Sequence, residues 1–230
     1  MTSTNALHEG PLVAVIGDVL GSRDYALDAR VAIQRELETV LEDVAYAYSD
    51  VVVSQPVITI GDEFQMLLAN ADILPDLVWG FATWCPHFSV RFGVGCGELY
   101  TPVAKSAIGM DGPVFHNARQ AIEIAKQRQW LGGVFVGFGS EWDPVLDGFA
   151  RLLEHRSGAM TRKQREVVNL LRDGMSQTAI AEQLGISKQS VNDHVNAVDW
   201  ESLRTGEAAW RVALRMACGA AMDGDELTQD

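Results

Sequence analysis

The sequence predicts an α+β fold, in which strands and helices alternate around an antiparallel sheet, followed by a short all-α module. Three observations predict it. Runs rich in β-branched residues recur along the first 138 residues and alternate with segments of helical spacing. These segments follow the order strand, helix, strand, strand, helix, strand, with extra elements around them. The last third has no strand pattern and consists of successive helices with capping residues.

The elements of the first part can be placed in order along the chain. Strands are expected at 11–18, in two runs of 56–69 around a Gly-Asp turn, at 88–99 and at 132–138. Helices are expected from Asp24 or Asp28 to about residue 48, at 73–84 and at 113–128. The apolar residues at helical spacing in the first helix are Val31, Leu37, Val40, Leu41 and Val44. This order is typical of a ferredoxin-like sheet.

A polar stretch with a glycine, EHRSGAMT at 154–161, separates the first part from the helical module. We therefore expect a domain at 1–155, a second at 159–218 and an acidic, disordered tail at 219–230. The net charge is −13. Residues 158–218 contain 8 basic and 7 acidic residues, so the acidity that opposes a nucleic-acid partner lies outside this module.

The composition, 47% hydrophobic and 21% charged, is typical of a soluble globular protein. No apolar run approaches the roughly 20 residues that a membrane span needs, and the polar N-terminus has no signal-peptide core. Cys85, Cys96 and Cys218 are scattered, without the spacing of a metal site or a disulfide framework. We expect a cytoplasmic protein with reduced thiols and no membrane partner.

Two strand runs end in the same dipeptide, VAVIGD at 13–18 and VITIGD at 57–62. In a ferredoxin-like sheet the first strand pairs antiparallel with the third, which places Asp18 beside Asp62, with Glu63 as a third acid. Neighbouring carboxylates repel unless a cation lies between them. Mg²⁺ binds such carboxylates together with substrate phosphates, so we predict a magnesium site at these three residues. The alternative is that Gly-Asp simply makes a good turn.

Two further features suggest a ligand beside these acids. The segment VLGSR at 19–23 offers Gly21 for close backbone approach, and Ser22 and Arg23 as phosphate donors before a helix. The strand at 88–99 also contains glycines at three alternate positions: Gly93, Gly95 and Gly97. Such spacing indicates that another backbone or a ligand lies close to one face of the strand.

Four blocks in order, VAVIGDVLGSR, ITIGDEFQMLL, VRFGVGCGEL and AIGMDGPVFHNARQAIE, resemble the SatD family. More distantly they are similar to class III nucleotide cyclases and GGDEF diguanylate cyclases, over about 11–138. The resemblance implies that Asp18 and Asp62 hold metal ions over a nucleotide whose phosphates the following loop wraps. The nucleotide-binding residues expected here are Val19, Leu20, Gly21, Ser22, Arg23 and Arg119.

The catalytic pattern of the cyclases is not matched. They carry an Asn and an Arg four residues apart on one helix, whereas Asn117 and Arg119 are two apart and do not face the same way. His116 could share a face with Arg119, but histidine is not the expected group. Arg119 could contact a phosphate or pair with Glu123. We expect purine nucleotide binding with Mg²⁺ and no catalytic residue; an active nucleotidyl cyclase or a triphosphate-processing enzyme is the alternative.

Residues 160–198 follow a helix-turn-helix pattern. Thr161, Ser176 and Ser187 can each cap a helix, and Gly174 and Gly185 fall where helices end. The residues expected to form its core are Val167, Val168, Leu170, Leu171, Ile180, Ala181, Leu184, Ile186, Val191 and Val195. The pattern resembles the DNA-binding modules of LuxR-type regulators and of sigma-factor region four. A purely structural role is the alternative.

The outward residues of this module suit double-stranded DNA. Gln189 and Asn192 can bond adenine edges and Lys188 a guanine or a phosphate, although Asp193 would be repelled. The full DNA-binding set expected is Arg162, Lys163, Arg165, Ser176, Gln177, Ser187, Lys188, Gln189, Ser190, Asn192 and His194. The amphipathic helix at 200–223 either completes the module's core or pairs with a second copy. The sequence therefore predicts a homodimeric transcriptional regulator that senses a nucleotide.

Overall fold

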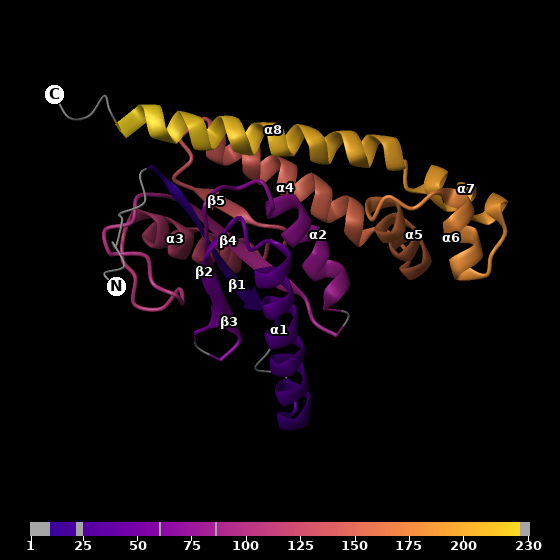
Figure 1. Cartoon of the computed structure of the whole chain (residues 1–230), viewed down its shortest axis with the longest axis horizontal. Helices are drawn as coiled ribbons and strands as arrows, with labels where there is room; N and C mark the ends of the chain where they lie inside the picture. Colours follow the sequence, from indigo (N-terminus) through magenta and orange to yellow (C-terminus); the bar gives the residue numbers. More distant parts are fainter. Residues whose placement is uncertain (1–9, 22–24, 60, 86, 226–230) are drawn as a thin grey trace, which may run out of the picture.

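The computed structural model describes residues 10–21, 25–59, 61–85 and 87–225 (Figure 1). Within these ranges the strands are β1 (Leu12–Val19), β2 (Val52–Ile58), β3 (Glu63–Leu68), β4 (Val90–Gly97) and β5 (Val134–Val136). The helices are α1 (Leu27–Ala47), α2 (Leu74–Trp84), α3 (Pro113–Arg128), α4 (Trp142–Gly158), α5 (Arg162–Arg172), α6 (Gln177–Leu184), α7 (Lys188–Ala197) and α8 (Trp200–Asp225). The α+β class predicted from the sequence is confirmed. Of the helices in the described part of the chain, none combines the length and apolar character that a bilayer crossing requires.

The strands form one sheet in the order β2-β3-β1-β4-β5. The central strand β1 is antiparallel to both β3 and β4, and β2 is antiparallel to β3. These directions are the ones expected for a ferredoxin-like arrangement of β1 to β4. β5 pairs parallel with β4 and adds an edge strand to it.

Side chains alternate along β1, so the sheet has two buried faces. Leu12, Ala14 and Ile16 pack against α3 in one apolar cluster. Val13 and Val15 belong to a larger cluster on the opposite face, to which α1, α2, α4 and α8 contribute. The helices therefore cover the sheet on both sides, with α3 the principal helix on one of them.

The glycines of β4 let α3 lie directly against the sheet. A Cβ atom on Gly93 would lie 2.2 Å from the backbone nitrogen of Ile122, and one on Gly95 would lie 2.2 Å from that of Ala118. The alternating glycines predicted that either another backbone or a ligand lies close to the strand. At Gly93 and Gly95 it is the backbone of α3.

The start of α1 differs from the prediction. Ala26 is its N-cap residue and makes no side-chain capping bond, Asp28 lies inside the first turn, and Asp24 lies outside the described residues. Val31, expected in the apolar stripe, is 43% exposed. This exposure follows from position, because the first turns of α1 extend past the ends of the strands (Figure 1).

The caps predicted for the helical module are confirmed. The side chain of Thr161 accepts from the N–H of Gln164 in a capping box, and the hydroxyls of Ser176 and Ser187 accept from backbone N–H groups of α6 and α7. Gly185 ends α6 with a φ of 63°, in the left-handed region that favours glycine. The sequence thus fixes the ends of these short helices locally.

The last helix corrects the tail prediction. α8 continues to Asp225, although disorder was expected over 219–230; residues 226–230 of that expected tail lie outside the described residues. Trp210 is fully buried against the sheet domain, with its ring 6.0 Å from that of Phe135. Leu203 instead joins a cluster with Val168 of α5. The helix therefore packs on both parts of the chain (Figure 1). Its packing on the sheet domain accounts for a helix that is longer than the small and acidic residues at its end predict.

Candidate functional site

The end of β1 lies beside the β2–β3 hairpin, as predicted. The N–H of Val19 donates to the carbonyl oxygen of Asp62 at 3.2 Å. The strand register places Asp18 directly opposite Glu63, so both side chains project from the same face as α3. Asp62 lies in the turn before β3 and lines a cavity of about 100 Å³ together with residues of α1. The ladder therefore pairs Asp18 with Glu63, while Asp62 acts on Asp18 from the turn: burial raises the pKa of the Asp18 carboxyl, and the charge of Asp62 helps to raise it.

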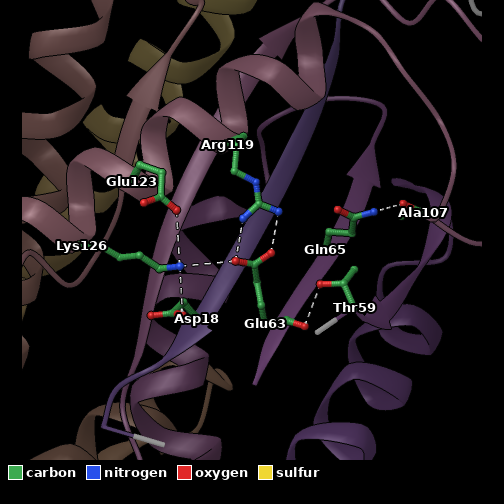
Figure 2. Close-up of polar contacts among 8 residues, drawn as sticks. All are labelled: Asp18, Thr59, Glu63, Gln65, Ala107, Arg119, Glu123 and Lys126. Carbon is green, nitrogen blue, oxygen red and sulfur yellow. Dashed lines mark hydrogen bonds and ion pairs between the residues drawn. The ribbon is translucent and has the colours of Figure 1, made fainter. Parts of the chain in front are cut away.

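Basic side chains neutralise this pair (Figure 2). Arg119 of α3 donates from both terminal nitrogens to the two oxygens of Glu63, at 2.7 and 2.6 Å. The Nζ atom of Lys126 lies 3.3 Å from Oδ1 of Asp18 and 3.5 Å from Oε2 of Glu63. Nε of Arg91 lies 3.5 Å from Oδ2 of Asp18. Every carboxylate oxygen of the pair thus faces a cation.

Burial and charge act on these groups in opposite directions. Burial raises the pKa of Asp18, and the charge of Lys126 offsets this only in part. Burial would also raise the pKa of Glu63, but Arg119 and then Lys126 hold that pKa below its usual value. Burial would lower the pKa of Lys126, yet the neighbouring carboxylates, Asp18 first, raise it. Lys126 therefore carries its positive charge at neutral pH.

The residues present do not fit a magnesium ion between Asp18 and Glu63. A hard cation needs oxygen atoms that are available to coordinate it, and here the ammonium of Lys126 already contacts both carboxylates. Across the described ranges, no group of three or more His, Cys, Asp or Glu residues is arranged to hold a metal ion. Magnesium at Asp18, Asp62 and Glu63 stays a prediction, and the ion would have to displace Lys126.

The loop after β1 offers fewer phosphate donors than expected. The N–H groups of Val19 and Leu20 already donate to carbonyl oxygens of the hairpin turn and of the residue before β4, at 3.2 and 2.9 Å. Gly21 is exposed, with a φ of 64°. Ser22 and Arg23 lie outside the described residues. A phosphate bound by the first two amides would have to break backbone bonds that hold the strand ends together.

The polar residues at the start of α3 make structural contacts. Nδ2 of Asn117 donates to the carbonyl oxygen of Cys96 at 2.8 Å. Nε2 of His116 lies 2.9 Å from Oδ1 of Asp111. Arg119 forms its ion pair with Glu63, and the alternative partner considered from its spacing, Glu123, pairs with Lys126 instead. Asn117 and Arg119 thus contact different strands and do not converge on one ligand position.

Comparison with known proteins places the whole arrangement in a family. The family model described as SatD matches residues 12–209, which is most of the chain. The chain belongs to the SatD family. The search of the curated proteins gave no match.

Three solved structures similar to this SatD chain are guanylyl cyclase domains, each aligned over 48% of the chain. The catalytic core of a rhodopsin-guanylyl cyclase with converted specificity, in complex with ATPalphaS, is 15% identical over 70% of its length, with a TM-score of 0.35. The guanylate cyclase domain of RhGC from Catenaria anguillulae, in complex with GTP, is 15% identical over 71%, with a TM-score of 0.36. The non-canonical dimeric domain of the RhoGC fusion protein from Blastocladiella emersonii is 13% identical over 72%, with a TM-score of 0.36. Similarity at this level carries no functional argument.

The SatD match includes α5, α6 and α7, which carry the predicted DNA-binding residues. Lys188 and Gln189 are exposed at the start of α7, where Nε2 of Gln189 donates to Oδ1 of Asp193 at 2.9 Å. The remaining predicted residues of α6 and α7 that are partly exposed are Gln177, Ser190, Asn192 and His194. The hydroxyls of Ser176 and Ser187 accept the capping bonds and keep a proton to donate.

The predicted residues of α5 have a different setting in this SatD protein. Arg162 and Arg165 line a groove of about 830 Å³ between α5 and the end of the sheet. Its other walls include Leu20, Tyr25 and Phe88. Lys163 pairs with a glutamate one turn later, at 3.0 Å. The two arginines therefore lie between the sheet domain and the helical module.

The contacts that hold α5 to the sheet domain were not predicted. Nε1 of Trp79 in α2 donates to Oδ1 of Asn169 at 2.8 Å. Arg172 pairs with Asp76 of α2 at 3.0 Å and also bonds Glu207 of α8. Sequence spacing gives no signal for such contacts, because the partners are far apart in the chain. By contrast, Lys126 follows Arg119 by two helical turns, and this spacing could have indicated a shared face.

Proposed function

We propose that this protein is a transcriptional regulator that binds double-stranded DNA through α5 to α7 and whose sheet domain senses a purine nucleotide. The observation that carries the proposal is the polar, exposed surface at the start of α7, presented after a glycine turn. A recognition helix needs such a surface at its N-terminal end, where it enters the major groove.

The packing of the helical module supports this role. Val167, Ile180, Ala181 and Val191 form a small buried cluster that joins α5, α6 and α7. This core uses the inner side of α7 and leaves Gln189 and its neighbours outside. The pair α6 and α7 also lies at the far end of the molecule from the sheet, where a duplex can approach (Figure 1).

The charge of the molecule argues for two copies on one duplex. Residues 158–218 are close to neutral and the whole chain is acidic, so electrostatic attraction to phosphates is weak. Linking two modules raises the overall affinity without a new contact, because the second binding event becomes intramolecular. We therefore include a homodimer as the DNA-binding form.

Replacing Gln189 by alanine is expected to weaken binding to the preferred DNA sequence by about 5- to 150-fold, because one bidentate base contact discriminates by about 1–3 kcal/mol. Binding to random duplex should change little. The preferred sequence is first selected with the wild-type protein from a random duplex pool, and both affinities are then measured at one salt concentration.

Gln34→Ala provides the matched control for Gln189→Ala. Gln34 is an exposed helical glutamine that donates to Glu38 four residues on, as Gln189 does to Asp193, but it lies on α1. The control should bind both duplexes like the wild type. Selection that enriches no sequence, or equal losses on both duplexes for Gln189→Ala, would contradict base recognition by α7.

The groove between α5 and the sheet supports the nucleotide half of the proposal. Its volume of about 830 Å³ lies within the range of small-molecule sites. Tyr25 and Phe88 offer aromatic surface for a base, while Arg162 and Arg165 offer cations for phosphates. A nucleotide there would contact both the sheet domain and the first helix of the DNA-binding module, which is the requirement for favouring one arrangement of the two. The magnesium site predicted from the sequence, at Asp18, Asp62 and Glu63, does not line this groove.

ATP or GTP is expected to raise the midpoint of thermal unfolding, with a stabilisation of about 2.7 kcal/mol when the nucleotide is at 100 times its Kd. Arg162→Ala should remove most of that rise, because it deletes a phosphate partner. The control Arg204→Ala deletes an exposed helical arginine paired with Glu201, away from the groove, and should keep it. The measurement is a thermal-shift series with each nucleotide, in MgCl₂ and in EDTA.

Two results would change this assignment. No shift with any nucleotide would contradict the sensor and leave a DNA-binding protein with an unliganded sheet domain. A cyclic or hydrolysed product, detected by chromatography after incubation, would favour the alternative of a nucleotidyl cyclase or triphosphate-processing enzyme. The engaged side chains of Asn117 and Arg119 give that alternative no support.

A further inference from the structure

The ammonium of Lys126 lies between the carboxylates of Asp18 and Glu63 (Figure 2). Its Nζ atom lies 3.3 Å from Asp18, 3.5 Å from Glu63 and 3.6 Å from Glu123, each through a carboxylate oxygen. An ammonium has three hydrogen-bond donors and no acceptor, so it can donate to all three carboxylates at once. The side chain is 31% exposed and is therefore largely withdrawn from water.

The carboxylate pair is stabilised by a cation that contacts both of its members. Asp18 and Glu63 are directly opposite across the β1–β3 ladder, and their side chains are only 16% and 10% exposed. Like charges directly opposite each other in a sheet are destabilising, and burial increases the penalty. Arg119 of α3 pairs with Glu63, and Arg91 of β4 lies 3.5 Å from Asp18. Lys126 differs from both because its ammonium contacts the two acids at once.

The close packing of α3 brings this lysine into place. Arg119, Glu123 and Lys126 follow one another at spacings of four and three residues, so they share one face of α3. That helix lies directly on β4 because Gly93 and Gly95 have no side chains to hold it away. The glycines of β4 and the cations of α3 are therefore parts of one arrangement. The glycines allow α3 to lie close to the sheet, and the cations of α3 neutralise the acids that the helix covers.

We propose that the ammonium of Lys126 is a built-in counter-ion that replaces a divalent metal at the Asp18–Glu63 pair. The sheet domain then holds this pair without magnesium, and a hard divalent cation binds there only when the lysine is removed. This inference does not depend on DNA binding or on a nucleotide in the groove, and it is tested on the full chain without either ligand.

The test is Lys126→Met, which keeps most of the apolar stem and removes the charge. In EDTA its unfolding midpoint should fall by about 5 °C relative to the wild type. Magnesium chloride at about ten times the Kd should restore at least about half of that fall. The wild type should respond to magnesium no more than to sodium chloride of equal ionic strength.

Three further variants separate neutralisation from simple packing. Lys163→Met removes another helical lysine that pairs with a single glutamate, and it should show no magnesium response. Lys126→Arg keeps the charge and should show none either. Adding Asp18→Asn to Lys126→Met removes one acid, so stability should recover and the magnesium response should disappear.

The outcomes are decisive in either direction. A wild type that magnesium stabilises, with the effect lost in Asp18→Asn, would overturn the proposal, as would a folded Lys126→Met that does not respond to magnesium. If Lys126→Met yields no folded protein, the double variant with Asp18→Asn decides. Its recovery supports neutralisation by the lysine, and its failure to fold overturns it.

Discussion

Gly95→Ala is expected to lower the free energy of unfolding by about 3 kcal/mol, the upper end of the usual cost of overpacking. The new Cβ atom would lie 2.2 Å from the backbone nitrogen of Ala118 and 2.4 Å from the carbonyl oxygen of Val114. Backbone atoms of a helix cannot rotate aside, so α3 as a whole must move outward. That movement would open the apolar cluster beneath α3 and draw its cations away from Glu63. Urea denaturation followed by tryptophan fluorescence measures the loss.

Gly206→Ala is the matched control for this change. Gly206 lies inside α8, and a Cβ atom there would meet nothing within 4 Å. Alanine in a helix interior is favoured over glycine by about 0.5–1 kcal/mol, so this variant should be more stable than the wild type. The same substitution is thus expected to have opposite signs at two positions. A Gly95→Ala variant within 0.5 kcal/mol of the wild type would refute the close approach of α3.

Features set by local chemistry were predictable from the sequence. The bounds expected for α3, 113–128, are those observed, because Pro113 suits a first helical turn and the apolar spacing continues to its end. The serine and threonine caps of α5 to α7 were predictable for the same reason: each bond spans three residues. The placement of Asp18 beside the hairpin followed from one rule about the handedness of crossovers.

Features set by distant partners were not predictable. A helix face that carries Arg119 and Lys126 can point to solvent, to a ligand or to buried acids, and the sequence does not distinguish these. Glu63 is 56 residues before Arg119 and 63 residues before Lys126, and Asp18 is on a still earlier strand. The same limit applies to α8. Its apolar side predicts that the helix is buried on one face, but it does not identify which part of the protein covers that face. Its packing on the sheet domain carries the helix beyond residue 219, where small and acidic residues indicate a tail.

Trp210→Ala is expected to cost about 3–5 kcal/mol of unfolding free energy, the range for a large aromatic removed from a core. Trp210 is fully buried on the face of the sheet opposite α3, against Phe135 and beside Leu214. The loss should also reach the helical module, because residues of the same helix hold α5 in place. Urea denaturation gives the total loss, and hydrogen exchange of the α5 to α7 amides shows how far it spreads.

The control for Trp210→Ala is Trp84→Ala, a helical tryptophan that is 40% exposed and should cost less than half as much. Faster exchange throughout α5 to α7 in Trp210→Ala alone would indicate that α8 transmits stability between the two parts of the chain. The physical route runs through two residues of α8 that flank Trp210 in the sequence. Glu207, one turn earlier, bonds Arg172 of α5. Arg211, the next residue, bonds Asp76 of α2 at 2.6 Å. If exchange in α5 to α7 stays as in the wild type, the two parts are energetically independent. A nucleotide bound to the sheet domain could then affect DNA binding only through the groove that it shares with α5.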